Sequence, residues 1–386
     1  MQLFRHGEFW HKAAEMAVSP APPDLLLAYA EAQAALARLA DRVTLSPVRG
    51  PLQTRIALAE RQALAALDSL DLPEDALTVD ARGRVATTPY DLTHWKQAIG
   101  QPIALTALAH DPAALLAWLG ADQPRSTGGD SLLTAADRDP TERLAAITRW
   151  QKAPLPPTPP LLQAARMADL WRQHAPLGRG DRVASLLIGD RWGAGRWPGS
   201  SGGLTALGLR HAGGLWKIAR GGDLDRLWLD AVRVGADAHL ETETRLRAYA
   251  GRVAPHLASR RRLGRLKEVI LFAMARPAIS SAQVAQALKL TSAGAIKLLS
   301  IAVSEGLLLE RTGQASYRSY AIPVSQPVPG RPAPGRRRRP AADPFAADFW
   351  TEEDGFSGVE QRSGAAVLDV ATADHFPSMR PGELEP

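Results

Sequence analysis

The chain has 386 residues and a formal net charge of +6, and at roughly 100–200 residues per domain this length predicts two or three domains. It contains no cysteine, which excludes a disulfide scaffold, an iron–sulfur cluster, a Cys-ligated zinc site and a cysteine nucleophile. The sequence has no apolar run of about 18 residues, so no transmembrane helix is predicted. The N-terminus lacks the apolar core of a signal peptide, so we expect a cytoplasmic protein with no membrane partner.

The positive charge is concentrated in one part of the chain. Residues 251–322 hold eleven Lys or Arg and three acidic residues, whereas residues 323–386 hold seven Arg and ten acidic residues. The first 250 residues are therefore nearly neutral. A clustered basic excess of this kind is typical of a protein that binds a polyanion, and nucleic acid is the first candidate.

The N-terminal part reads as helical. Residues 1–22 end in prolines and are predicted to form a flexible leader. The density of Ala and Leu after Asp24 predicts a helix over 24–40 with Asp24 as its N-cap. A second helix is predicted over 53–70, and residues 77–84 are typical of a turn or a short hairpin.

The middle of the chain continues this pattern with irregular inserts. Further helices are predicted over 91–99, 111–119, 141–150, 161–174 and 224–250. Residues 153–160 contain five prolines, which remove backbone donors, so we expect a rigid non-helical connector there. Residues 178–222 are rich in glycine, and their pattern predicts no defined element. The prediction for residues 23–250 is thus a mainly α, multi-helix body.

Residues 264–322 carry the strongest signal in the sequence. An apolar stripe at helical spacing predicts a first helix, which ends before Pro277. A second helix is predicted over 282–288, with Ser280 or Ser281 as its N-cap. A short connection then leads to the next predicted element.

A third helix is predicted over 293–305, capped by Thr291 or Ser292 and stopped by Gly306. Its spacing leaves Ala295 or Ile296 as an inward-facing residue. Two strands, over 307–311 and 317–322, are predicted to follow it around a Thr-Gly-Gln turn. This order resembles the bacterial winged helix-turn-helix family. The resemblance implies that residues 251–322 form a DNA-binding domain of three helices and a β-hairpin wing.

In such a domain the third helix would lie in the major groove, with its N-terminal residues at the base edges. The residues expected to contact DNA are Ser281, Gln283, Thr291, Ser292, Ala293, Lys297, Arg311, Gln314 and Arg318. The residues expected to add auxiliary, salt-sensitive phosphate contacts are Arg260, Arg261, Arg262 and Arg265. The predicted partner is double-stranded DNA, bound by a homodimer where the operator has two half-sites.

A second resemblance is carried by residues 174–182, which read His-Ala-Pro-Leu-Gly-Arg-Gly-Asp-Arg. They resemble the active-site loop of Fic/Doc proteins, helical enzymes that transfer a nucleotide monophosphate to hydroxyl groups. Aligned on Gly180, the loop keeps the family's proline at Pro176. The family's catalytic histidine falls on Ala175, and its metal-holding acid falls on Arg179.

The chemistry of the family is not retained in this loop. His174 is one residue out of register, which turns its side chain by about 100° on a helix. Asp181 and Arg182 stand where the family has asparagine and glycine. Without an aligned general base or a metal-binding acid, the loop predicts a degenerate Fic-like body with no catalytic residue, metal or cofactor.

The sequence therefore predicts a sequence-specific DNA-binding protein, a transcriptional regulator, with a Fic-like helical body. Two alternatives stay open. The loop over 174–186 could perform nucleotidyl or phosphoryl transfer. The 293–305 helix has no Arg, Asn or Gln, so the C-terminal domain could instead serve a protein-interaction adaptor. Residues 323–386, rich in Pro and Arg and then acidic, are predicted to be a disordered tail.

Overall fold

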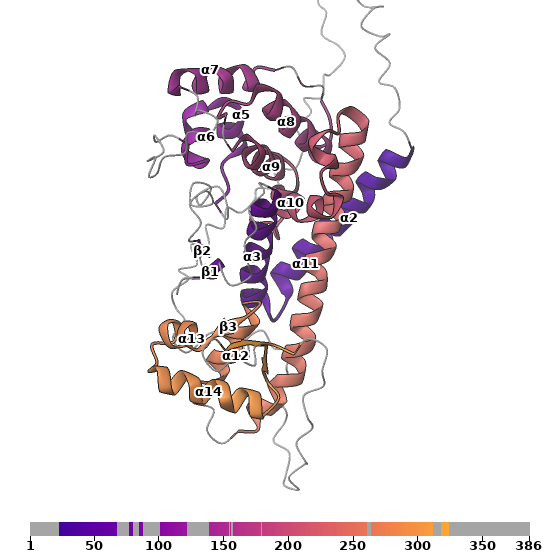
Figure 1. The fold of residues 1–386 in the computed structure, drawn as a ribbon. Helices are drawn as coiled ribbons and strands as arrows, with labels where there is room; N and C mark the ends of the chain where they lie inside the picture. Colours follow the sequence, from indigo (N-terminus) through magenta and orange to yellow (C-terminus); the bar gives the residue numbers. More distant parts are fainter. Residues whose placement is uncertain are drawn as a thin grey trace, which may run out of the picture.

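The computed structural model describes residues 23–67, 77–79, 85–87, 101–121, 139–153, 155, 157–178, 180–260, 264–311 and 318–323. Within these ranges the protein is mainly α (Figure 1), as the sequence predicts. The predicted leader, the predicted helix over 91–99 and the predicted tail beyond Pro323 lie outside the described residues.

The helices of the body are α2 (Pro23–Leu45), α3 (Arg49–Leu67), α5 (Leu105–His110), α6 (Pro112–Trp118), α7 (Pro140–Gln151), α8 (Pro160–His174), α9 (Asp181–Trp192), α10 (Leu204–Leu209) and α11 (Gly221–Ala258). Short 3-10 turns, η1 (Ala194–Arg196), η2 (Arg210–Ala212) and η3 (Leu215–Lys217), connect α9, α10 and α11. Strands β1 (Leu77–Val79) and β2 (Val85–Thr87) pair antiparallel, so the turn or short hairpin predicted over 77–84 is a hairpin whose second strand follows those residues. Helix α8 begins one residue inside the predicted connector, because proline is tolerated at the first helical position.

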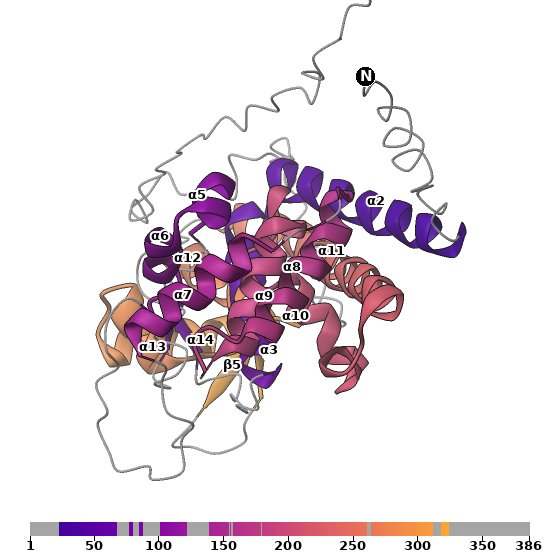
Figure 2. The same cartoon turned by 90° about the horizontal axis from the view of Figure 1, so that it is seen from above.

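Helix α9 lies at the centre of the body and packs along α8 (Figure 2). Every residue from Val183 to Asp190 is buried. A helix that is buried on all sides belongs in a core. In the sequence this segment is only a short apolar run among glycines, which predicts no particular element. The glycine-rich stretch, whose pattern predicts no element, therefore contributes the central helix of the body.

Helix α11 is 38 residues long, which corresponds to about 57 Å. It runs from the body down to the C-terminal end of the molecule (Figure 1). Its contact with α10 depends on two glycines. A Cβ on Gly208 would lie 1.8 Å from the Ala231 carbonyl oxygen, and one on Gly235 would lie 2.3 Å from the Leu204 carbonyl oxygen. The two backbones therefore touch directly.

The C-terminal unit comprises α12 (Leu266–Met274), β3 (Ile279–Ser280), α13 (Ser281–Ala287), α14 (Ser292–Ser304), β4 (Leu309–Glu310) and β5 (Ser319–Ala321). The strands form a small antiparallel sheet in the order β3-β5-β4. Ile279 pairs with Tyr320, and Leu309 pairs with Ala321. The three helices fall where the sequence places them. The strands are shorter than predicted, because Leu307 and Leu308 turn into the core instead of extending the sheet.

The C-terminal unit is fastened to the body by hydrogen bonds as well as by packing. The buried hydroxyl of Tyr249, on α11, donates to the Leu307 carbonyl at 2.7 Å. The Nε of Arg55, on α3, donates to the Met274 carbonyl at the end of α12 at 2.9 Å. Burial raises the pKa of Tyr249, so its hydroxyl remains a donor at neutral pH. The unit is thus held from two helices of the body.

A buried carboxylate on α3 organises the loop before α10. Glu60 is fully buried. One of its oxygens accepts hydrogen bonds from the backbone N–H groups of Ser201 and Gly203 at 2.7 and 2.8 Å. The other lies 2.9 Å from Nε2 of His239 on α11. Because buried charge is costly unless it is hydrogen-bonded, this carboxylate fixes the path of the loop.

A second buried carboxylate, Asp190 on α9, holds the same loop and the start of α10. It accepts from the Ser200 hydroxyl at 2.6 Å and from the backbone and hydroxyl of Thr205 at 3.0 and 2.8 Å. Burial, together with the nearby charge of Glu60, raises the pKa of Asp190 to about 6.

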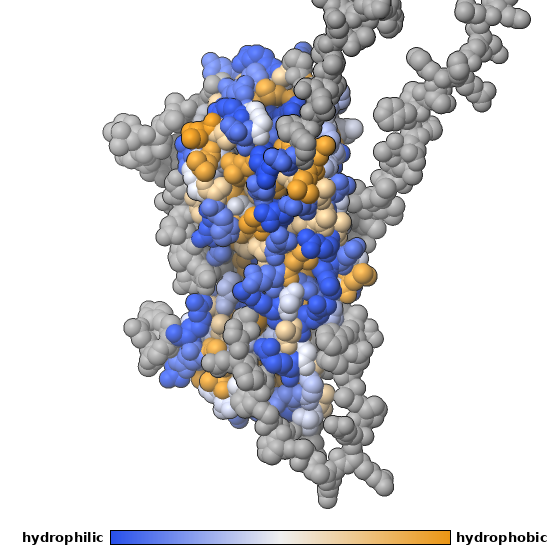
Figure 3. All heavy atoms as spheres, turned by 90° about the vertical axis from the view of Figure 1, so that its right-hand side faces the viewer, coloured by the Kyte–Doolittle hydropathy of each residue, from blue (hydrophilic) through white to orange (hydrophobic). Residues whose placement is uncertain are grey.

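The side of the molecule that carries α2 and α11 is a mosaic of hydrophilic and hydrophobic side chains (Figure 3). Among the described residues, no single helix is long and apolar enough to cross a membrane. The pair α13 and α14 passes the same length and composition test together, with a bend of 116° between them.

We predict that Gly208→Ala lowers the free energy of unfolding by about 3 kcal/mol, because the new Cβ forces α10 away from α11. The matched control is Gly50→Ala on α3, whose Cβ would meet nothing within 4 Å and which should be neutral or slightly stabilising. Chemical denaturation of both variants measures the difference. Equal stabilities would contradict the direct backbone contact.

We predict that Asp190 makes the protein less stable as pH rises from about 4 to about 6. Its raised pKa means that the folded state holds this proton to a higher pH than the unfolded chain does. Between the two pKa values the unfolded state binds fewer protons, so the free energy of unfolding falls with pH. Between about pH 4 and about pH 6, the free energy of unfolding should fall by about 2 kcal/mol more in wild type than in Asp190→Asn, measured by denaturation at a series of pH values. The exposed control Asp41→Asn should follow wild type.

Candidate nucleic-acid interface

Helices α13 and α14 form an angled pair at the outer end of the C-terminal unit. They are bent by 116° across a connection of four residues, 288–291. Lys289 in this connection has a φ of +50°. Its N–H donates to the Gln286 carbonyl, and the next N–H, from Leu290, donates to the Ala285 carbonyl. This is the Schellman pattern, which ends a helix sharply and usually uses glycine at the left-handed position.

The structure shows which residue caps each of these helices, where the sequence left two candidates for each. Ser280 caps α13: its hydroxyl accepts from the Gln283 N–H at 3.2 Å, and the Gln283 side chain accepts from the Ser280 N–H at 2.9 Å. Thr291 caps α14 by accepting from the Gly294 N–H at 3.1 Å. The side chains of Gln283 and Thr291 are therefore engaged in capping, while Ser281 is half-buried at the start of α13.

The outer face of α14 is small and polar. Ala295, Leu299 and Ala302 are buried, and they form the inner face of the helix. The exposed residues recur at helical spacing and are Ser292, Ala293, Ile296, Lys297, Ser300 and Ser304. Of the two inward candidates that the sequence left open, Ala295 faces the core, whereas Ile296 is 48% exposed. The face is open to solvent along its length.

Two lysines on this surface have no ion pair with any described residue. Lys297 is exposed on the outer face of α14, and Lys289 is exposed in the α13–α14 connection. Arg318, also exposed, lies 3.5 Å from Glu310 across the β4–β5 pair. Arg311 is exposed at the end of β4. These four cations border the outer face of α14 and the strands.

Two of the arginines predicted to make auxiliary phosphate contacts are engaged in contacts within the protein. Arg260 forms an ion pair with Glu305. Arg265 makes three hydrogen bonds to Glu268 and another to the Leu288 carbonyl. Both guanidinium groups thus stabilise the C-terminal unit internally. Arg261, Arg262 and Gln314 lie outside the described residues.

The loop that resembles the Fic motif uses its polar groups internally. Asp181 begins α9, is buried, and accepts hydrogen bonds from the N–H groups of Leu177 and Gly178 at 3.1 and 2.8 Å. The amides that could have faced an anion are therefore turned onto this carboxylate. The left-handed conformations of Ala175 and Gly180, with φ of 42° and 81°, shape the turn.

The other residues of this loop do not come together in one site. His174 is half-buried at the end of α8, Pro176 is buried, and Arg182 is exposed. Arg179 lies outside the described residues. Within the described ranges, no group of three His, Asp or Glu side chains could hold a metal ion.

Lys289 is the residue that sequence reasoning missed. The sequence marks its position as a tight connection, but a lysine there carries no sign of its left-handed backbone or its exposure.

No protein-family model matches the chain, and no curated protein is detectably similar to it. Its function therefore rests on the chemistry of its own residues.

We predict that Lys289→Gly raises the free energy of unfolding by about 1 kcal/mol, because glycine adopts the left-handed conformation without the Cβ strain of lysine. Lys297→Gly, in the interior of α14, should lower it by about 1 kcal/mol while removing the same charge. Thermal or chemical denaturation of the two variants tests this contrast. A loss of stability in Lys289→Gly would show that the lysine side chain itself supports the turn.

Proposed function

We propose that the protein binds duplex DNA sequence-specifically through a winged helix-turn-helix domain and acts as a transcriptional regulator. The observation that carries the proposal is the α13–α14 pair with the free outer face of α14. In helix-turn-helix domains two helices meet at about 90–120° across a turn of three to four residues. The bend of 116° and the four-residue connection fit that description.

The arrangement of the strands supports a wing. The order of elements is a helix, a short strand, two angled helices and two strands, with the sheet order β3-β5-β4. In this arrangement the β4–β5 pair follows α14 in the chain, and Arg311 and Arg318 flank its two strands. Contacts from such a hairpin to phosphates would fix the register of α14 on the duplex.

The composition of α14 sets how it would read DNA. Ser292 and Ala293 lie exposed at its N-terminus, where a recognition helix meets base edges. Serine can accept from or donate to a base, and the alanine methyl can contact thymine. Small side chains also allow a close approach of the helix to the groove floor. Lys289 and Lys297 would supply the charge on either side of this contact.

The body would then serve to present the domain. Tyr249 and Arg55 hold the C-terminal unit against α11 and α3, so the orientation of α14 is set by the body. A dimer formed through the body would place two such helices on two half-sites, which is the usual way in which an operator is recognised.

We predict that Lys297→Ala combined with Arg318→Ala weakens duplex binding at least about tenfold, which corresponds to about 1.4 kcal/mol. The duplex is first selected from a random pool on the purified protein, and affinities are measured by fluorescence anisotropy over a series of salt concentrations. The slope of log affinity against log salt should become shallower by about one for each phosphate that the variant no longer neutralises.

The matched control for this experiment is Arg149→Ala combined with Arg210→Ala. Both residues are exposed on the body, so the control removes the same charge from another surface. Unchanged affinity in the double variant, or an equal weakening in the control, would overturn docking through α14 and the wing.

A further inference from the structure

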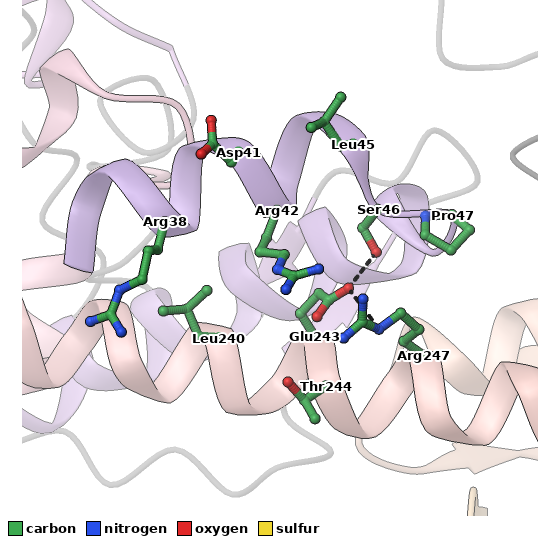
Figure 4. Close-up of a pocket in the computed structure, with 10 residues that line it drawn as sticks. All are labelled: Arg38, Asp41, Arg42, Leu45, Ser46, Pro47, Leu240, Glu243, Thr244 and Arg247. Atoms are coloured by element: carbon green, nitrogen blue, oxygen red, sulfur yellow. Dashed lines mark hydrogen bonds and ion pairs between the residues drawn. The ribbon is translucent and has the colours of Figure 1, made fainter. Parts of the chain in front are cut away.

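A groove of about 470 Å³ lies between the C-terminal end of α2 and the middle of α11 (Figure 4). This volume is within the range of small-molecule sites. The groove is lined by Arg38, Asp41, Arg42, Leu45, Ser46, Pro47, Leu240, Glu243, Thr244 and Arg247. We refer to it as the α2–α11 groove. It is separate from the proposed DNA-binding face.

Two guanidinium groups face each other across this groove. Figure 4 shows those of Arg42 and Arg247 on either side of the Glu243 carboxylate. Arg42 is exposed and forms no ion pair with a described residue. The side chain of Arg247 is 32% exposed, and its Nε lies 3.6 Å from Glu243, which is beyond hydrogen-bonding distance. Its guanidinium donates no hydrogen bond to a described residue. The groove therefore presents unused donors from two helices.

The carboxylate at the base of the groove is only partly satisfied. Glu243 is 1% exposed. Its Oε1 accepts from the Ser46 hydroxyl at 2.8 Å and is the oxygen nearest to Arg247. Its Oε2 accepts no hydrogen bond from a described residue. This oxygen is therefore open to a donor from a ligand, because Glu243 lines the groove.

We propose that the α2–α11 groove binds a small molecule that carries an oxyanion, a carboxylate or a phosphate, next to a hydroxyl or amine donor. The oxyanion would lie between Arg42 and Arg247, since guanidinium groups bind such anions through paired N–H donors. The neighbouring donor would bind Oε2 of Glu243. The side chains of Leu45 and Leu240 would contact the carbon skeleton.

Such a ligand would bridge two elements of the body. Arg42 belongs to α2, and Arg247 and Glu243 belong to α11. Binding to the folded state alone raises its stability by an amount that grows with ligand concentration. The same helix α11 reaches Tyr249 less than two turns further on, so the ligand would sit close to the attachment of the C-terminal unit. The binding itself does not depend on the proposed DNA function.

The test uses titration calorimetry on the full chain with two probes. Citrate combines carboxylates with a hydroxyl donor, and glycerol 3-phosphate combines a phosphate with hydroxyl donors, so the pair distinguishes the two sources of the oxyanion. Each is added up to about 10 mM, which detects a millimolar Kd. We expect at least one probe to bind and to raise the thermal midpoint, whereas glycerol should do neither.

Variants locate the binding. Arg42→Gln and Arg247→Gln should each lower the affinity for the probe at least about tenfold. The control Arg149→Gln, which changes an exposed arginine on α7, should leave the affinity unchanged. Glu243→Gln should strengthen the binding of sulfate, which has no donor, because it removes a like charge from the groove. Far-UV circular dichroism checks that each variant is folded. The proposal is overturned if neither probe binds, or if the groove variants bind as well as the control.

Discussion

The direct contact between α10 and α11 fixes how the body and the C-terminal unit are joined. Gly208 and Gly235 allow the two backbones to touch, and this places α11 deep enough in the body for His239 to reach Glu60. From there the helix continues outward to Tyr249 and the C-terminal unit. A side chain at either glycine would shift the helix that joins the body to the α13–α14 pair.

The buried carboxylates follow from this arrangement. Glu60 and Asp190 come from α3 and α9, and their oxygens accept hydrogen bonds from the loop that leads into α10 and from Thr205 at the start of α10. Each carboxylate would be strongly unfavourable in a core without these donors. The loop and the helices therefore stabilise each other. The carboxylates fix the path of the loop, and the hydrogen bonds from the loop offset the cost of burying the carboxylates. Hydrogen bonding within the protein thus gives this cluster a structural role.

Some basic side chains of the C-terminal unit make contacts within the protein, and others are exposed on its surface. Arg260 and Arg265 stabilise the unit through glutamates, and Arg276 is buried with its guanidinium over the Phe272 ring at 3.5 Å. The basic excess of this segment is consequently larger in the sequence than on the surface. Among the described residues of this segment, Lys289 and Lys297 are exposed lysines that form no ion pair with another described residue. For the proposed binding of a duplex, this arrangement predicts moderate non-specific affinity and a larger part for DNA shape in recognition.

Most helices and their limits could be read from the amino-acid order, because amphipathic spacing, prolines and capping residues are local properties. The order of elements in the C-terminal unit could be read in the same way, since Thr291, Gly306 and the apolar stripe of each helix act within a few residues. Local pattern did not distinguish Ser280 from Ser281 as the cap of α13, or Ala295 from Ile296 as the inward residue of α14. Neighbouring positions are nearly equivalent until the core is present.

Long-range packing was needed to establish the central position of α9, the burial of Glu60 and Asp190, and the internal use of Arg260 and Arg265. Each of these depends on partners outside its own element: Glu60 meets residues near 200 and 239, and Arg260 meets Glu305. The α2–α11 groove arises in the same way, because Arg42 and Arg247 come from helices that only the fold brings together. A side chain's type and local spacing say what it can bond to, but its partner is fixed by which distant backbone the packing places within reach.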